Sequence, residues 1–201
     1  MTQEVCKVYI VRRFKEAGYA LSNEERAAKL AQVAAARQEC GGKLLVSAAS
    51  RWSDYGTYGF GAEIFPDFAS LQKHTAALDN LDWFRYIESE SFIGTPAVVN
   101  EPAYENAVYA LQLIHGRRES SYALPEEQFH NEFKRVIDSA DTFGRRRLLR
   151  MDCLWSREDY AMIQVHEWPS LEACMKHTAF EEQVEWPRLI DQRHILGVKA
   201  P

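Results

Sequence analysis

The tetrapeptide Lys-His-Thr-Ala at positions 73–76 occurs a second time, unchanged, at positions 176–179, which is 103 residues further along the chain. The same shift, applied without a gap, aligns matching residues across nearly the whole sequence. The matches include Phe65-Pro66 with Trp168-Pro169, Trp52-Ser53 with Trp155-Ser156, Trp83 with Trp186, Arg85 with Arg188, Ile87 with Ile190, Gly41 with Gly144 and Gly94 with Gly197. A repeat of this length is the signature of two copies of one structural unit.

Hydrophobic periodicity predicts the same element order in both copies. Alternation and β-branched residues indicate strands, and Ser22-Asn23-Glu24-Glu25 before the first long helix is typical of an N-cap. Gly41-Gly42 suits the end of that helix. The first copy has predicted strands at 5–14, 43–52, 58–65 and 92–95, with helices at about 23–40 and 68–88. The second has strands at 109–117, 146–155, 160–168 and 195–199, with helices at 125–143 and 171–191.

This β-α-β-β-α-β order, present twice, is that of the split βαβ or ferredoxin-like unit. Each unit has both helices on one face of its sheet and leaves the other face bare and apolar. Two such sheets packed face to face would bury both faces. We therefore predict an α+β protein of two tandem ferredoxin-like units, with a first half at 1–95, a linker at 96–105 and a second half at 106–201.

Composition limits the function classes. The chain has 201 residues and 46% hydrophobic residues, enough for a substantial core. It carries 24 Lys and Arg against 29 Asp and Glu, a net charge of −5, which disfavours nucleic acid as a partner. No apolar run is long enough to suggest a membrane partner. Cys6, Cys40, Cys153 and Cys174 have no metal-type spacing, so we expect four free thiols in a cytoplasmic protein.

The unit resembles the dimeric α+β barrel superfamily, and in particular its antibiotic-biosynthesis-monooxygenase-like branch. The family pattern is a Glu two residues before an aromatic that ends the third strand, with a His nine residues after the aromatic. The first half has Glu63, Phe65 and His74, and the second has His166-Glu167-Trp168 followed by His177. The resemblance implies a barrel closed by the two sheets, related by a pseudo-twofold axis. It also implies a ligand held between each sheet and its helices, with His74 or His177 lining that space.

The first half is the predicted site. Gly59 and Gly61 stand where the second half has Met162 and Gln164, and glycine inside a strand often marks the close approach of a ligand or of another backbone. The first half therefore looks hollow and the second half filled. The alternatives are a bulge, or helix side chains that fill the gap. Strand parity places one set of residues on the helix-facing side: Val46, Ala48, Trp52, Gly59, Gly61, Glu63 and Phe65, with Leu149, Met151, Cys153, Trp155, Met162, Gln164, His166 and Trp168 as their second-half counterparts.

Glu63 and His74 are the predicted catalytic pair, because a carboxylate beside an imidazole raises its pKa toward that of a general base near neutrality. The alternative is a structural pair. Trp52, Tyr9, Phe65, Gly59 and Gly61 are the predicted substrate-binding residues, and His177, His166, Trp155 and Gln112 are their second-half equivalents.

No cofactor and no metal are predicted. In similar heme-degrading enzymes the iron-ligating His lies ten residues beyond the position of His74, where this chain has Phe84 and, in the second half, Pro187. The resemblance thus implies a cofactor-independent enzyme that transfers a proton on a small apolar, aromatic or polyketide-like substrate. The alternative is a non-catalytic protein of the same fold that binds a small ligand or a partner. Exposed strand edges would also allow a homo-oligomer.

Overall fold

The computed structural model describes residues 3–200 and contains the predicted duplication. The first half consists of β1 (Val5–Phe14), α1 (Glu16–Tyr19), α2 (Asn23–Glu39), β2 (Lys43–Ala49), β3 (Gly59–Phe65), α3 (Phe68–Asn80), the 3-10 turn η1 (Trp83–Arg85) and β4 (Ile87–Val99). The second half repeats this order with β5 (Val108–Arg117), α4 (Glu119–Tyr122), α5 (Glu126–Thr142), β6 (Arg146–Asp152), β7 (Met162–Trp168), α6 (Leu171–Gln183), η2 (Trp186–Arg188) and β8 (Ile190–Lys199).

Local sequence explains where the long helices begin. Ser22 and Glu25 form a reciprocal capping box at the start of α2, as expected from the sequence. Asp67 and Ser170 cap α3 and α6 with their side chains. Gly41 and its repeat equivalent Gly144 have φ of 70° and 80°, the left-handed conformation that glycine adopts readily after a helix.

The second helix of each half is shorter than predicted, and the last strand is longer. α3 ends at Asn80 and α6 at Gln183, because the chain then turns through left-handed Asp82 and Glu185 into a 3-10 turn. The strands β4 and β8 begin soon afterwards, at Ile87 and Ile190. β4 also runs through 96–99 of the predicted linker, where it pairs with β6.

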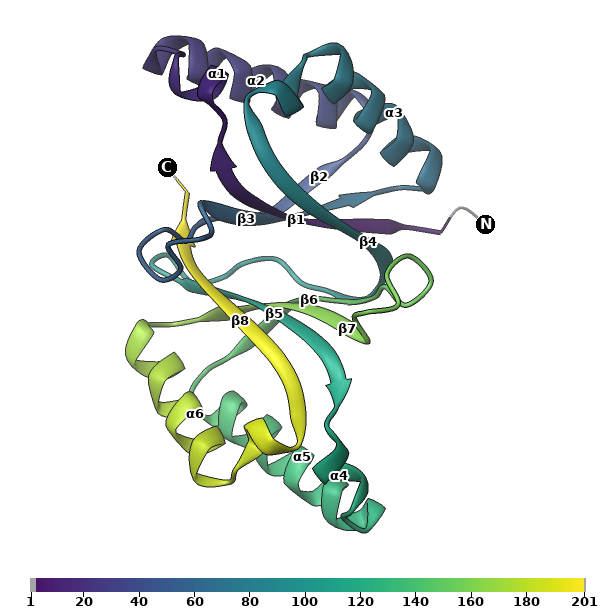
Figure 1. Cartoon of the computed structure of the whole chain (residues 1–201), viewed down its shortest axis with the longest axis vertical. Coiled ribbons are helices and arrows are strands. Elements are labelled where there is room, and N and C mark those ends of the chain that lie inside the picture. The colour runs from purple at the N-terminus through teal and green to yellow at the C-terminus, as the bar shows by residue number, and fades with distance from the viewer. Residues whose placement is uncertain (1–2, 201) are drawn as a thin grey trace.

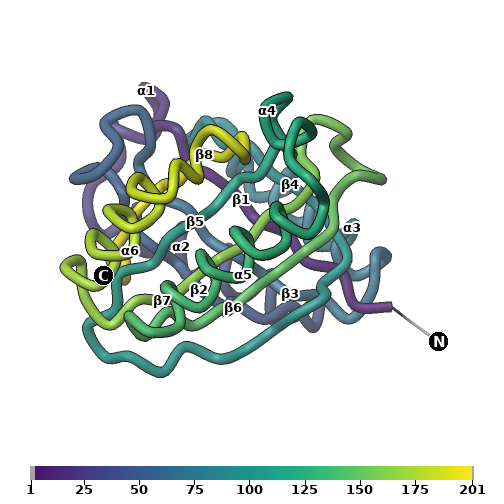
Figure 2. Tube along the Cα trace, turned by 90° about the horizontal axis from the view of Figure 1, so that it is seen from below, coloured from purple at the N-terminus to yellow at the C-terminus, as the bar shows by residue number. Residues whose placement is uncertain are grey.

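The eight strands close into one barrel in the order β1-β3-β2-β8-β5-β7-β6-β4. The helices cover it on two opposite sides, α1 to α3 on one and α4 to α6 on the other (Figure 1). Viewed from below, α5 and α6 lie across the strands of the second sheet (Figure 2). The two sheets meet at two seams, β4 with β6 and β2 with β8.

The barrel interior is the main core, and it confirms the predicted sheet-to-sheet packing. Its buried side chains come from both halves and include Val8, Ile10, Phe60, Phe92, Leu111, Leu113, Leu149, Met151, Ile163 and Ile195. The space that remains for ligands therefore lies outside the barrel, between each sheet and its own helices.

Candidate functional site

Glu63 and His74 lie near each other in the first half but do not form the predicted hydrogen-bonded pair. His74 Nδ1 is 4.0 Å from Glu63 Oε2, whereas Arg37 of α2 donates to Glu63 Oε1 at 3.1 Å. Both ring nitrogens of His74 are buried without a hydrogen-bond partner among the described residues. Burial, helped by the charges of Lys7 and Arg37, lowers the pKa of His74 although Glu63 opposes the shift. The expected rise in this pKa is therefore wrong.

A cavity of about 610 Å³ lies between the first sheet and α2, and we call it the first-half cavity. Tyr9, Gly59, Glu63 and Arg37 line it, while His74 is packed against the ring of Phe65. A Cβ on Gly61 would come within 2.4 Å of the Tyr9 phenol. The gap at Gly61 is thus filled by Tyr9 of the neighbouring strand β1, and not by a helix side chain as the alternative had it.

Gly59 is explained by the backbone. A Cβ at this position would lie 2.4 Å from the carbonyl oxygen of Ala48 on the neighbouring strand. Both glycines of β3 are therefore explained by neighbouring protein atoms, the Tyr9 side chain at Gly61 and the Ala48 backbone at Gly59. Trp52 and its counterpart Trp155 are about half exposed on the loops that follow β2 and β6. Neither lines the first-half cavity or the second-half cavity described next.

The second half has its own cavity of about 490 Å³ between its sheet and the helices α5 and α6, so it is not filled as its sequence suggested. We call it the second-half cavity. Cross-strand pairing puts Gln164 opposite Gln112, and Gln112 opposite His194, in one row across the sheet. Ala110 and His166 form the next row toward the linker end of the barrel. These rows face the helices and line the cavity.

Strand parity was correct for β7 and wrong for β6. Leu149, Met151 and Cys153 were expected beside the helices but are buried in the barrel interior. Met151 pairs with Ile163 and Leu149 with Val165, so the register at the hairpin gives these residues the interior face of β7 and not the face of Gln164 and His166. In the same way Ala48 pairs with Phe60 and Val46 with Ala62, which sends Val46 and Ala48 into the interior of the barrel.

Four imidazoles line the second-half cavity: His115, His166, His177 and His194. His177 has both nitrogens engaged, with Nε2 3.3 Å from Glu181 Oε1 and Nδ1 3.4 Å from Ser139 Oγ. His166 Nε2 lies 3.1 Å from Gln164 Oε1, and His115 Nδ1 lies 2.8 Å from the carbonyl oxygen of Asp159. His194 has no hydrogen bond to any described residue, and its accessible surface lines the cavity, whose walls desolvate the ring. Nowhere in residues 3–200 do three such ligands gather into a preformed metal site.

The electrostatics of this cavity favour the neutral form of two of its histidines, His166 and His194. Burial lowers the pKa of His194 below the ordinary 6.5, with His177 and Arg145 adding to the shift and Glu181 opposing it. Burial also holds the pKa of His166 well below that value. Burial favours a raised pKa for Glu181, but the hydrogen bond from His177 and the nearby His194 outweigh it, and the pKa is lowered. The cavity therefore holds a carboxylate at Glu181 and neutral imidazoles at His166 and His194.

Sequence reasoning missed His194. The predicted helix was extended to position 191 and the last strand begun at 195, so this residue fell between elements. The alternation of Gln192, His194 and Leu196 within β8 was the available signal. The repeat makes the residue informative, since its first-half equivalent is Ser91, which pairs with Tyr9 as His194 pairs with Gln112. Gln112 itself was predicted and donates to Gln192 at 2.7 Å.

Comparison with known proteins gives a fold. No protein-family profile and no curated protein matches the sequence. Solved structures do match, among them a doubly substituted chlorite dismutase from Candidatus Nitrospira defluvii, with TM-score 0.76, 16% identity and coverage of 98% of this chain and 92% of that chain. The chlorite dismutase of the same organism in complex with imidazole matches with TM-score 0.74, 14% identity and coverage of 98% and 91%.

These similarities show the fold, a duplicated ferredoxin-like α+β barrel like that of the chlorite dismutases. The monooxygenase-like branch is not supported by them and stays a prediction. The expectation of a cofactor-independent enzyme is wrong, because the matched proteins are heme-dependent enzymes. The described residues contain no helix long and apolar enough to cross a membrane.

Proposed function

We propose that the second-half cavity binds heme and that the protein is a heme-dependent enzyme. The observation that carries this proposal is the His194 imidazole, which lines the cavity without a hydrogen-bond partner among the described residues. The chlorite dismutase-like fold supports it independently.

His194 is the residue that would hold the heme iron. Heme iron in proteins is held by a histidine, cysteine, methionine or tyrosine side chain, and an imidazole must be neutral to donate its lone pair. Burial lowers the pKa of His194, so the neutral form predominates at neutral pH. His177 and His166 are poorer candidates, because their nitrogens already bond Glu181, Ser139 and Gln164.

The cavity walls suit the rest of the heme. The apolar macrocycle would contact aromatic and aliphatic side chains, those of Ile114, Phe129, Phe133, Val136, Ile137 and Trp186. Arg117 and Arg145 also line the cavity, and a guanidinium would bind the carboxylates of heme well. Bound heme would supply an iron centre for redox chemistry on a small substrate. Around it, Gln112, Gln164 and Gln192 would orient polar groups, and Glu181 would hold the proton of His177 Nε2.

Titration of the protein with heme, followed by the Soret absorption band, tests the proposal. We expect saturation at one heme per chain, since the first-half equivalent of His194 is Ser91. His194→Ala should weaken binding at least about tenfold, and added imidazole should restore the band of the liganded iron. His130→Ala is the matched control, because His130 is exposed on α5 and does not line the second-half cavity.

The pH dependence adds a second readout. Because the pKa of His194 lies below 6.5, heme affinity should stay constant as the pH falls to about 6.5 and decrease only at lower pH. Absence of a saturable Soret shift, or equal affinity in wild type and His194→Ala, would contradict the proposal.

The first-half cavity carries a separate expectation. Tyr9, Gly59 and Glu63 line it together with apolar side chains, in keeping with the small organic ligand predicted for this half. Binding of such a ligand there stays a prediction, and no proton transfer by Glu63 and His74 is part of it.

A further inference from the structure

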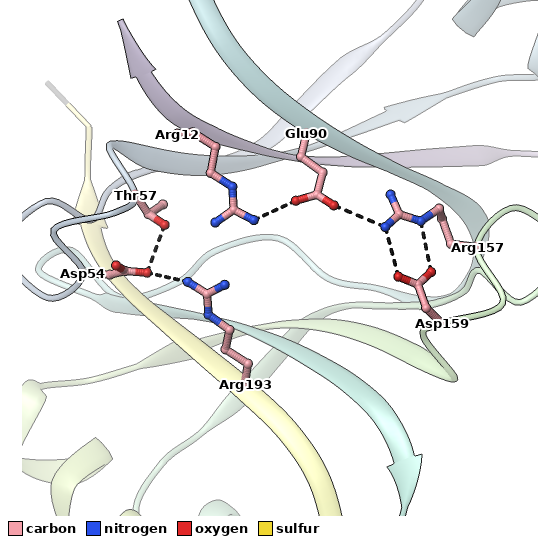
Figure 3. Close-up of polar contacts among 7 residues, drawn as sticks. All are labelled: Arg12, Asp54, Thr57, Glu90, Arg157, Asp159 and Arg193. Carbon is pink, nitrogen blue, oxygen red and sulfur yellow. Dashed lines mark hydrogen bonds and ion pairs between the residues drawn. The ribbon is translucent and has the colours of Figure 1, made fainter.

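Each half sends one hairpin loop across to the other half. The first-half loop at 50–58 brings Asp54 to Arg193 of β8, with Oδ2 and Nη2 2.7 Å apart. The second-half loop at 153–161 brings Arg157 to Glu90 of β4, with Nη2 and Oε1 3.3 Å apart. Figure 3 shows both ion pairs in the region between the two sheets. We call them the two latches.

The repeat makes the latches equivalent, with their charges exchanged. A shift of 103 residues places Asp54 on Arg157 and Glu90 on Arg193. The first half therefore offers an acidic loop and an acidic strand position, and the second half offers a basic residue at both places. Each latch joins opposite charges only when a first half meets a second half.

We propose that the latches select the pairing of unlike halves, so that the barrel closes between a first and a second half and not between two copies of the same half. In a barrel of two first halves, Asp54 would meet Glu90. In a barrel of two second halves, Arg157 would meet Arg193. Such juxtaposed like charges are a recognised means of excluding wrong partners.

The uncharged contacts of the same loops do not discriminate. Ser53 donates to the backbone oxygen of Leu196, and Ser156 donates to that of Ile93. These two contacts are equivalent under the repeat, so they would form in any pairing of the halves. Selection by these loops therefore rests on the four charged residues.

Neighbouring charges do not remove the mismatch. Arg12 already bonds Glu90 at 2.7 Å within the first half, and Asp159 already bonds Arg157 at 3.0 Å within the second. In a barrel of like halves each would have to neutralise an additional charge. The latches are partly exposed, and matched pairs of this kind contribute little to stability, so the discrimination comes from the repulsion between like charges in the wrong pairings.

The test uses two full-length variants of equal net charge. In the first, Asp54→Arg with Arg157→Asp exchanges the loop charges. Within one chain both latches then bring like charges together, whereas barrels formed by like halves of two chains have opposite charges at the same places. Asp54→Arg with Arg193→Glu reverses one latch and keeps both matched. Size-exclusion chromatography with light scattering measures the molar mass of each variant and of wild type over a range of protein concentrations.

We expect the loop-exchanged variant to double the wild-type mass at low salt and to return to it at about 1 M NaCl, where the Debye length is about 3 Å. The latch-reversed control should keep the wild-type mass, because the linked halves meet at a high effective concentration. Wild-type mass for the loop-exchanged variant, an enlarged control, or enlargement that salt leaves unchanged would overturn the proposal. If the loop-exchanged variant is unfolded at low salt, recovery of wild-type mass at high salt supports the proposal, and failure to recover contradicts it.

Discussion

Single histidines link this fold to pH. His74 and His166 are buried, and burial holds both pKa values below 6.5. In the unfolded chain they titrate near that ordinary value, so the unfolded state binds more protons as the pH falls below it. The free energy of unfolding should therefore decrease between about pH 6.5 and the lower folded pKa values, by up to roughly 1.4 kcal/mol per pH unit for each histidine.

Replacing His74 with Gln should make this acid-dependent loss of stability shallower, as measured by urea unfolding between about pH 7 and pH 5. His130→Gln is the control, because His130 is exposed on α5 and should leave the slope unchanged. A slope in His74→Gln equal to that of wild type would show that the His74 imidazole is not what senses the acid.

At the scale of elements, a buried carboxylate fixes the connection between the two halves. Glu167 of β7 is fully buried, accepts hydrogen bonds from the backbone N–H groups of Ala103 and Tyr104 at 2.9 Å, and pairs with Arg146 at 2.8 Å. Its first-half equivalent is the apolar Ile64. The second half thus holds the connection through an interaction for which the first half has no counterpart.

Glu167→Ala should lower the free energy of unfolding by roughly 1 to 3 kcal/mol, since it removes a buried acceptor from the partly buried donors of Tyr104 and Arg146 and from the N–H of Ala103. It should also speed proteolytic cleavage within 100–107. Glu172→Ala is a matched control: this carboxylate is exposed on α6 and pairs with Lys176, and its loss should change stability by no more than about 0.5 kcal/mol. Equal cleavage rates in the two variants would argue against this role for Glu167.

At the scale of the whole molecule, the barrel has one strong and one weak seam. Four residue pairs join β4 to β6, and the backbone N–H of Asn100 extends this ladder to Leu148. Two residue pairs join β2 to β8, extended by the N–H of Ala200 to Ser47. Because local opening is easiest where few hydrogen bonds must break, the barrel should open first between β2 and β8.

Amide hydrogen exchange read by mass spectrometry checks this order. Peptides that cover the end of β8 should exchange faster than peptides that cover 95–100. Slower exchange at the end of β8 would mean that side-chain packing, and not the number of backbone bonds, decides which seam opens.

The sequence by itself determined the duplication, the order of elements and the packing of two sheets, because a repeat and hydrophobic periodicity are properties of the linear chain. It also identified Gln112 and His166 as cavity-lining residues, since strand alternation around them holds in β5 and β7, and it identified His177 through the family resemblance. The tertiary structure alone decided that Arg37 binds Glu63, that Tyr9 fills the space at Gly61 and that the hairpin registers turn Val46, Ala48, Leu149 and Met151 to the barrel interior. It also decided that His194 points into the second-half cavity. Each of these depends on which strands and helices meet across long sequence separations, and local pattern does not encode those distances.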